Sequence, residues 1–221
     1  LHYPLRRQRQ MCIRDRRNRN LKAGRARMVQ KIPEAGYRFI PGVYQYSAGV
    51  AAEPGFRLER VRFAEPVPLM AGFARIAAWL EAQGRPKAAF AACELRSPAP
   101  FTEEGFASFN RVYGRVLQEW GLFRDGLNPI ARSNVCPEIA PPAEPCFHAF
   151  VYTVQDADAA PSFAIAGSGE AAEGKGDYRS NTVALGDTSH EGMLAKARWV
   201  LGEMERLSLI HISEPTRLRR I

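Results

Sequence analysis

Alternating apolar and polar positions, or short aromatic and β-branched runs bounded by Pro and Gly, predict β-strands. The segments with such patterns are Tyr37–Ala52 (two strands around Pro41-Gly42), Phe56–Phe63, Lys87–Ser97, Ala131–Val135 and Cys146–Val154. Two other segments, Gly72–Gly84 and Phe101–Leu122, have apolar residues at helical spacing, and Thr102 is the expected N-cap of the second. The resulting order, β-β-β-α-β-α-β-β, predicts an α+β fold with two helices packed on one face of a mixed sheet.

The pattern restarts after a polar linker at Asp156–Pro161. Three elements are predicted there: a strand hairpin in SFAIAGSGEAA, a strand in TVALGD and a helix from Glu191 to about Glu205. An offset of 120 residues aligns four identities: Gly49 with Gly169, Gly72 with Gly192, Ala77 with Ala197 and Trp79 with Trp199. We therefore predict a tandem duplication, with unit 1 over residues 28–155 and the first half of a second unit over residues 161–206.

Both ends of the chain differ in pattern from the rest. Leu207–Arg217 can be written in codons that resemble a transposase adapter used in sequencing libraries, and Arg6–Asp15 can be written as its inverted copy. We therefore interpret residues 1–16 and 207–221 as translated adapter and exclude them from the fold. Met28 is the expected start codon, and the adapter is expected to replace the rest of the second unit. We further expect this chain alone to have low solubility and little activity.

The formal net charge of +8 would suggest a nucleic-acid or membrane partner. However, residues 1–20 hold seven Arg and one Asp, and residues 207–221 hold three Arg and one Glu. Residues 21–206 therefore keep 21 of the 31 basic and 21 of the 23 acidic side chains, a net charge of zero. We expect neither a nucleic-acid nor a membrane partner, because no basic patch and no membrane-spanning apolar run remain.

Three cysteines, Cys93, Cys136 and Cys146, lie outside the adapter segments. They lack metal-ligand spacing, and no base stands at motif spacing to activate one as a nucleophile, so we interpret them as small apolar residues. A reduced, cytoplasmic protein without a metal is the expectation.

The segments FASFNRVYGRVL and ARS, followed by a closing strand, resemble the RidA (YjgF-type) superfamily over about Tyr37–Val154. The strings IPGVYQYSAGV, ACELRSPAPFTE, NPIARSNVCPE and AGSGEAAEG resemble more narrowly its 2-aminomuconate and 2-amino-5-chloromuconate deaminase branch. Members of that branch resemble two RidA-like halves in one chain. The resemblance implies a RidA-like (chorismate-mutase-like) fold and an enzyme that hydrolyses an enamine or imine carboxylate without a cofactor and releases ammonia. The full-length protein is expected to be a homo-oligomer.

Arg132 matches the family arginine that holds the substrate carboxylate. A guanidinium suits this role because it donates two parallel hydrogen bonds to a carboxylate. The alternative is a surface or interface salt bridge. Ser133 and Asn134 follow on the same strand and could help hold the anion, although Asn134 could equally be a polar residue at a strand end.

His148 stands where typical RidA members carry an acidic residue that is thought to activate water. An imidazole can serve as a general base or acid, but a hydrogen-bonded core histidine is an equal alternative. Glu94 and Arg96 should share one strand face and form either a structural ion pair or a second carboxylate clamp with an acid. Glu170 is implied as a substrate-binding residue by the resemblance alone.

We expect Arg132 and His148 to lie on neighbouring strands and to face one cleft, where a small carboxylate binds. A non-catalytic binding or regulatory module is the alternative function, because the same fold hosts both.

Overall fold

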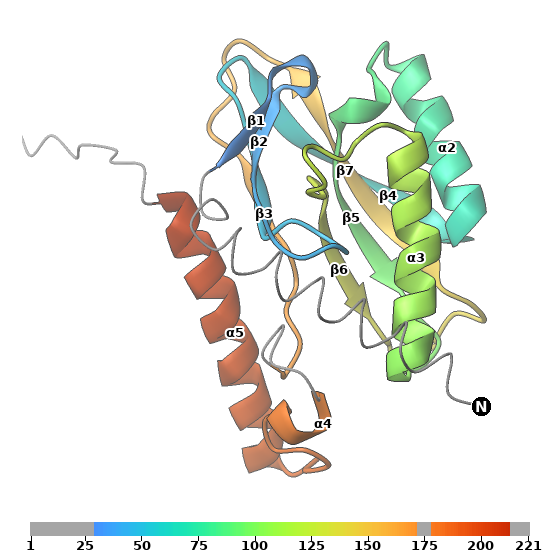
Figure 1. Ribbon diagram of the computed structural model, residues 1–221, viewed down its shortest axis with the longest axis vertical. Helices are drawn as coiled ribbons and strands as arrows, with labels where there is room; N and C mark the ends of the chain where they lie inside the picture. The colour runs from blue at the N-terminus through green and yellow to red at the C-terminus, as the bar shows by residue number, and fades with distance from the viewer. Residues whose placement is uncertain (1–28, 172–177, 213–221) are drawn as a thin grey trace, which may run out of the picture.

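The computed structural model describes residues 29–171 and 178–212. Its strands are β1 (Gln30–Ile32), β2 (Tyr37–Ile40), β3 (Gly49–Ala52), β4 (Phe56–Pro68), β5 (Phe90–Arg96), β6 (Ala131–Val135), β7 (Cys146–Gln155) and β8 (Phe163–Ile165). Its helices are α2 (Leu69–Ala82), α3 (Glu103–Glu119), α4 (Tyr178–Asn181) and α5 (His190–Ile212), with short 3-10 helices η1 (Pro33–Ala35) and η2 (Lys87–Ala89). The predicted α+β class is confirmed (Figure 1).

The strands form two four-stranded sheets instead of one, in the orders β1-β2-β3-β8 and β4-β7-β5-β6. In the second sheet β7 runs antiparallel to both β4 and β5, whereas β5 and β6 are parallel and are connected through α3. Ser47 links the two sheets: its N–H donates to the Ile130 carbonyl at 2.8 Å, beside the start of β6. The edge strand β6 therefore lies next to the chain that leads into β3.

Helices α2 and α3 pack side by side on one face of the β4-β7-β5-β6 sheet, as predicted (Figure 1). Thr102 caps α3, since its Oγ1 accepts a hydrogen bond from the Gly105 N–H at 3.1 Å. The core under the helices is aromatic, and Phe73 of α2 contacts Phe147 of β7 with 4.9 Å between ring centroids. Gly72 permits this approach, because a Cβ at its position would overlap the Phe147 ring.

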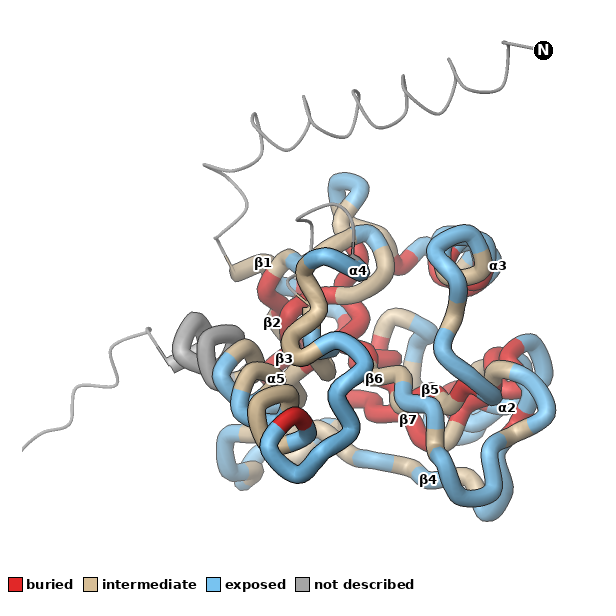
Figure 2. Tube along the Cα trace, turned by 90° about the horizontal axis from the view of Figure 1, so that it is seen from below, coloured by how far each residue is buried: buried red, intermediate tan, exposed pale blue. Residues whose placement is uncertain are grey.

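A second core lies between the two sheets and consists mostly of small and aromatic residues, among them Tyr37, Phe39, Val50, Ala91 and Ala131. Viewed from below, the buried segments concentrate between the sheets and beneath α2 and α3 (Figure 2). The β4-β7-β5-β6 sheet is thus covered by helices on one face and partly by the other sheet on the opposite face.

The segment after Pro161 differs from the predicted repeat. Its strand β8 pairs with β3 and so extends the first sheet, instead of starting a sheet of its own. The predicted strand over Thr182–Asp187 is wrong, because this segment forms turns after α4 and only Thr182 makes a bridge, to Ala171. Apolar residues there alternate over too few positions to sustain a ladder. The predicted helix is confirmed as α5, which begins at His190.

The duplication and the boundary at residue 161 therefore stay predictions, with the predicted strand order not reproduced in the described residues. Residues 1–16 and most of 207–221 lie outside the described ranges, but helix α5 continues to Ile212. Ile210–Ile212 is thus helical and is not the core strand that would have contradicted the adapter interpretation. No helix in the described part of the chain is long and apolar enough to cross a membrane.

Candidate functional site

Arg132 is a buried arginine with no carboxylate partner in the part of the chain that the structure describes. It lies in β6, directly opposite Cys93 of β5, and is only 4% exposed. Its Nη1 has no hydrogen-bond partner, and none of the ion pairs between described residues includes Arg132. Burying an uncompensated charge is costly, so such a residue needs an explanation in function.

Three aromatic rings surround the Arg132 guanidinium. Its Cζ lies 4.8 Å from the ring centroid of Tyr113, 5.5 Å from that of Tyr46 and 5.7 Å from that of Phe109. Phe109 and Tyr113 come from α3, and Tyr46 comes from the loop that precedes β3. These cation–π contacts offset part of the lost hydration but leave the N–H groups of Nη1 without a hydrogen-bond acceptor. We call Arg132 with these three rings the arginine cage.

The loop that carries Tyr46 is fixed at two points. Asn128 donates from Nδ2 to the Tyr44 carbonyl at 3.2 Å, and its Oδ1 accepts from the Ile130 N–H at 2.9 Å. Gly114 of α3 accommodates Tyr44, because a Cβ there would lie 2.5 Å from the tyrosine hydroxyl. The arginine cage therefore depends on contacts between the loop, α3 and β6.

A hydrogen bond between Cys93 and Tyr113 helps to hold one ring of the arginine cage in place. The Cys93 Sγ and the Tyr113 hydroxyl are 3.4 Å apart, and both residues are buried. Burial raises the pKa of the Cys93 thiol to about 12 and raises the pKa of Tyr113 well above its ordinary value. Both groups are thus neutral at physiological pH, which agrees with the interpretation of Cys93 as a packing residue.

Glu94 lies in a second group of charged residues, on the other face of the sheet. Arg60 of β4 holds its carboxylate with two hydrogen bonds, one of them from Nη2 at 2.9 Å. Arg96 approaches the same carboxylate at 3.7 Å, which confirms that the two residues share a face and favours the structural ion pair over a clamp. The hydrogen bonds from Arg60 lower the pKa of Glu94, so the carboxylate stays ionised.

His148 belongs to this second group. It lies opposite register shifts in both neighbouring strands, between Arg62 and Val67 of β4 and between Glu94 and Leu95 of β5. Burial first, and then nearby arginines led by Arg96, lower its pKa, while Glu94 opposes them. The imidazole is therefore neutral at physiological pH. The register shifts at His148 are typical of β-bulges, which often re-aim a side chain beside a functional site.

The prediction that Arg132 and His148 share one cleft on neighbouring strands is wrong for a single chain. Strand β5 separates β6 from β7, and the two side chains belong to opposite faces of the sheet. Arg132 packs against α3, whereas His148 is surrounded by charged residues on the face away from the helices. The cause is the alternation of side chains along a strand combined with an intervening strand that the sequence pattern does not reveal.

The remaining predicted residues lie around β6 without a common centre. Ser133 faces Gly167, whose Cβ, if present, would lie 3.1 Å from the serine Cβ. Asn134 accepts a hydrogen bond from the Ser97 hydroxyl at 3.0 Å, which favours its role as a polar residue at a strand end. Glu170 is exposed, three residues beyond Gly167, whose N–H donates to the Arg132 carbonyl at 3.1 Å.

Sequence reasoning missed the three rings around Arg132, which belong to Tyr46, Phe109 and Tyr113, and the buried amide of Asn110. Three of them lie in FASFNRVYGRVL, where their helical spacing suggested only a buried face. An Asn on the apolar face of a helix was the available signal. Asn110 is 3% exposed, and neither atom of its amide has a hydrogen-bond partner.

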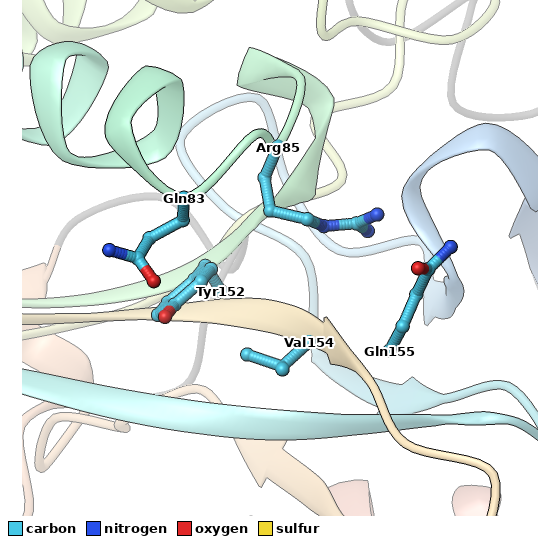
Figure 3. Close-up of a pocket in the computed structure, with 5 residues that line it drawn as sticks. All are labelled: Gln83, Arg85, Tyr152, Val154 and Gln155. Carbon is cyan, nitrogen blue, oxygen red and sulfur yellow. The ribbon is translucent and has the colours of Figure 1, made fainter.

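A separate pocket of about 180 Å³ lies between the end of α2 and the end of β7 (Figure 3). It also contains an arginine, Arg85, but this guanidinium donates to the Thr153 carbonyl at 3.0 Å and to the Ala35 carbonyl at 3.1 Å and stacks on Phe56. Because Nε and Nη2 of Arg85 already donate to groups of the chain, the pocket is a weaker candidate than the arginine cage. The described residues contain no group of three or more His, Cys, Asp or Glu suited to a metal ion.

These features define an α+β protein with a buried, unpaired guanidinium at the edge of a mixed sheet. A family profile described as 2-aminomuconate deaminase CnbZ matches residues 29–213. The chain belongs to this 2-aminomuconate deaminase family.

A curated relative supports the assignment. The chain is 52% identical over 172 residues to 2-amino-5-chloromuconate deaminase of Comamonas testosteroni, an alignment that covers 77% of this chain and 68% of that protein. The resemblance to the aminomuconate deaminase branch is thereby confirmed. A crystal structure of a YjgF family member from Neisseria meningitidis is also similar, with 17% identity, a TM-score of 0.26, and coverage of 57% of this chain and 99% of that one.

Proposed function

We propose that this chain is a cofactor-independent deaminase that hydrolyses an enamine or imine carboxylate such as 2-aminomuconate and releases ammonia. The observation that carries the proposal is the buried, unpaired Nη1 of Arg132 inside the arginine cage. A carboxylate bound there would receive charge-assisted hydrogen bonds in a water-poor site, where they are strong. The names of the matching family and of the curated relative support this substrate class.

The reaction requires placement of groups and proton transfer. The enamine tautomerises to an imine, water adds to the C=N carbon, and the resulting carbinolamine loses ammonia to leave a carbonyl. Arg132 would hold the carboxylate, and flanking rings would exclude bulk water and orient a planar conjugated chain. A neutral imidazole such as that of His148 can accept the proton of the attacking water, and an ionised Glu94 can share this work.

His148 and Glu94 cannot reach the arginine cage of their own chain, because they lie on the other face of the sheet. We therefore propose that the complete site forms between two copies or two RidA-like units, with Arg132 from one and His148 and Glu94 from the other. The partly exposed side chains of Glu94 and Arg96, 27% and 22% accessible, leave this face available for contact. A homo-oligomeric, cytoplasmic enzyme is the corresponding proposal for the whole protein, with Ser133, Asn134, Arg96 and Glu170 as secondary substrate contacts.

Ammonia release from 2-aminomuconate tests the proposal, together with binding of a carboxylate ligand by calorimetry. Wild type should bind the ligand and release ammonia faster than the buffer control, even if turnover is low. Arg132→Met should lose both, whereas Arg85→Met, which removes an arginine that donates from Nε and Nη2 within the chain, should keep both. Ligand binding without any ammonia release would instead fit a non-catalytic binding module. Unchanged release by Arg132→Met would refute the proposed anchor.

A further inference from the structure

Asn110 has a buried amide that no described residue satisfies. Its Nδ2 and Oδ1 both lack partners, although the residue is only 3% exposed. Asn128, which is 1% exposed, provides the internal comparison, because both atoms of its amide are hydrogen-bonded. The fold thus satisfies one buried asparagine and leaves the other unpaired. An unpaired buried amide is costly and calls for an explanation in ligand binding.

The position of Asn110 on α3 places it beside the arginine cage. It precedes Tyr113 by three residues and Gly114 by four, so the three positions lie on one face of the helix. Tyr113 contacts the Arg132 guanidinium, and Gly114 faces the hydroxyl of Tyr44 in the loop that carries Tyr46. Asn110 therefore lies on the face of α3 that takes part in the junction of α3, β6 and the loop, where Nη1 of Arg132 is unpaired.

The other unpaired buried atoms among the described residues do not belong to this junction. Ser47 pairs with Ala131, so its hydroxyl shares the face of Ala131 in the core between the sheets. Trp199 lies on α5, on the far side of the first sheet (Figure 1). Arg132 and Asn110 are therefore the two residues at this junction whose buried polar side-chain atoms have no partner among the described residues.

We propose that Asn110 is a specificity-determining residue that recognises the substrate nitrogen next to the carboxylate held by Arg132. The Oδ1 would accept a hydrogen bond from the amino or imino N–H, and the Nδ2 would donate to a carboxylate oxygen or to the attacking water. The site then selects planar 2-amino or 2-imino carboxylates over acids without this nitrogen. The inference rests on the proposed function, since it takes Arg132 as the carboxylate anchor.

The amide is chemically suited to this task beside an arginine. An aspartate at position 110 could also accept an N–H, but it would pair with the Arg132 guanidinium and compete with the substrate carboxylate. An asparagine provides the acceptor and leaves the positive charge of Arg132 for the ligand. Asn110→Asp should therefore weaken binding of every carboxylate while raising the unfolding temperature.

Two isosteric acids test the proposal by calorimetry on the whole chain. Pyrrole-2-carboxylate carries an N–H next to the carboxylate, and furan-2-carboxylate has an oxygen there, while size, planarity and charge are matched. Wild type should bind the pyrrole acid about tenfold more tightly, the discrimination expected from one buried hydrogen bond and a lone-pair clash. Asn110→Leu should abolish this preference and keep the affinity for the furan acid within about threefold. Asn110→Ser serves the same comparison if the leucine variant does not fold.

Asn128→Ser is the matched control, since it alters an equally buried amide that holds the loop. It should change the affinity for both acids by the same factor and keep the preference. Equal binding of the two acids by wild type, or a preference that survives in both Asn110 variants, would overturn the assignment of Asn110. If neither acid binds wild type, or if Arg132→Met binds both acids normally, the anchor fails, and with it the proposed function.

Discussion

At the scale of single residues, the central feature is the unfavourable placement of Arg132. The guanidinium lies under α3 among three aromatic rings, and cation–π contacts replace only part of its hydration. A residue that is costly in the free protein but suited to a charged ligand is typical of a binding site, where stability and function are in conflict. Asn110 is a similar case with an uncharged side chain, because its buried amide also lacks a partner among the described residues.

Arg132→Met should stabilise the free protein while removing ligand binding. The methionine fills similar space without a buried charge, so the free energy of unfolding should rise by about 1 kcal/mol. Urea denaturation measures the stability, and calorimetry with furan-2-carboxylate measures binding. Arg132→Lys, which keeps the charge, should lose at least about tenfold in affinity because it cannot donate in a bidentate way. A methionine variant that is clearly less stable than wild type would show that Arg132 is a structural residue.

Tyr113 should position Arg132 through its ring more than through its hydroxyl. Tyr113→Phe keeps the ring, so KM should stay within about threefold, while loss of the hydrogen bond to Cys93 costs about 1 kcal/mol of stability. Tyr113→Leu removes a cation–π contact of about 1–2 kcal/mol and should raise KM about tenfold with a smaller change in kcat.

Tyr37→Phe is the control for this pair. Tyr37 is also fully buried, and its hydroxyl donates to the Phe90 carbonyl at 3.2 Å without contacting Arg132. It should lose similar stability and leave KM unchanged. If KM rises in Tyr37→Phe as much as in Tyr113→Leu, the rise in Tyr113→Leu is caused by lost stability and not by the lost ring contact with Arg132.

At the scale of elements, the order and the faces of the strands decide which residues meet. Strand β5 lies between β6 and β7, and β7 is displaced against both neighbours at His148. These two facts separate Arg132 from His148 and bring His148 to Glu94, Arg60 and Arg96 instead. Among the described residues, the sheet thus carries the unpaired Arg132 under α3 and the ion pairs of Glu94 with Arg60 and Arg96 on its other face.

The pH dependence of stability should show the effect of the Glu94 ion pair. Hydrogen bonds from Arg60 lower the pKa of Glu94 in the folded chain below its ordinary value of 4.5. The stabilisation is therefore complete above about pH 4.5 and disappears as the pH falls through the lowered folded value. Between pH 5 and pH 3, Glu94→Gln should lose less unfolding free energy than wild type, by less than about 1 kcal/mol because the pair is partly exposed. Identical pH profiles would show that the ion pair contributes nothing.

Local patterns predicted most elements, because periodicity and capping are properties of neighbouring residues. The alternation of Phe56–Phe63 predicted β4, and Thr102 with its following acidic residues predicted the start of α3. Strand β1 has only three residues before a proline, too few to show a period. The strand order, the split into two sheets and the pairing of β8 with β3 depend on contacts between distant residues, which one sequence does not display.

The same limit applies to the site. Arg132 was predicted from its motif, whereas its cage is formed by a loop and a helix far from it in sequence. The sequence prediction places His148 and Glu94 in one site with Arg132. Only the pairing of β5 with β6 and β7 shows which strands are neighbours and which side chains share a face. Asn110 was read as part of a helical motif, and only the lack of partners in the fold distinguishes it.

At the scale of the whole molecule, the basic excess belongs to residues 1–20 and 207–221. Residues 21–206 hold 21 basic and 21 acidic side chains, whereas the whole chain has a net charge of +8. The whole chain should bind heparin at low salt and be released as salt rises, whereas a chain limited to residues 21–206 should not be retained. If the shorter chain is still retained at about 0.1 M salt, it has a basic surface that the count of charged side chains does not show.

The most direct test of the account is the position of a bound carboxylate in a crystal structure of the whole chain with pyrrole-2-carboxylate. We expect the carboxylate within hydrogen-bond distance of Arg132 Nη1, between Tyr46 and Tyr113, with the ring nitrogen at Asn110. A carboxylate held instead by Arg60 and Arg96 beside His148, with the arginine cage empty, would contradict it.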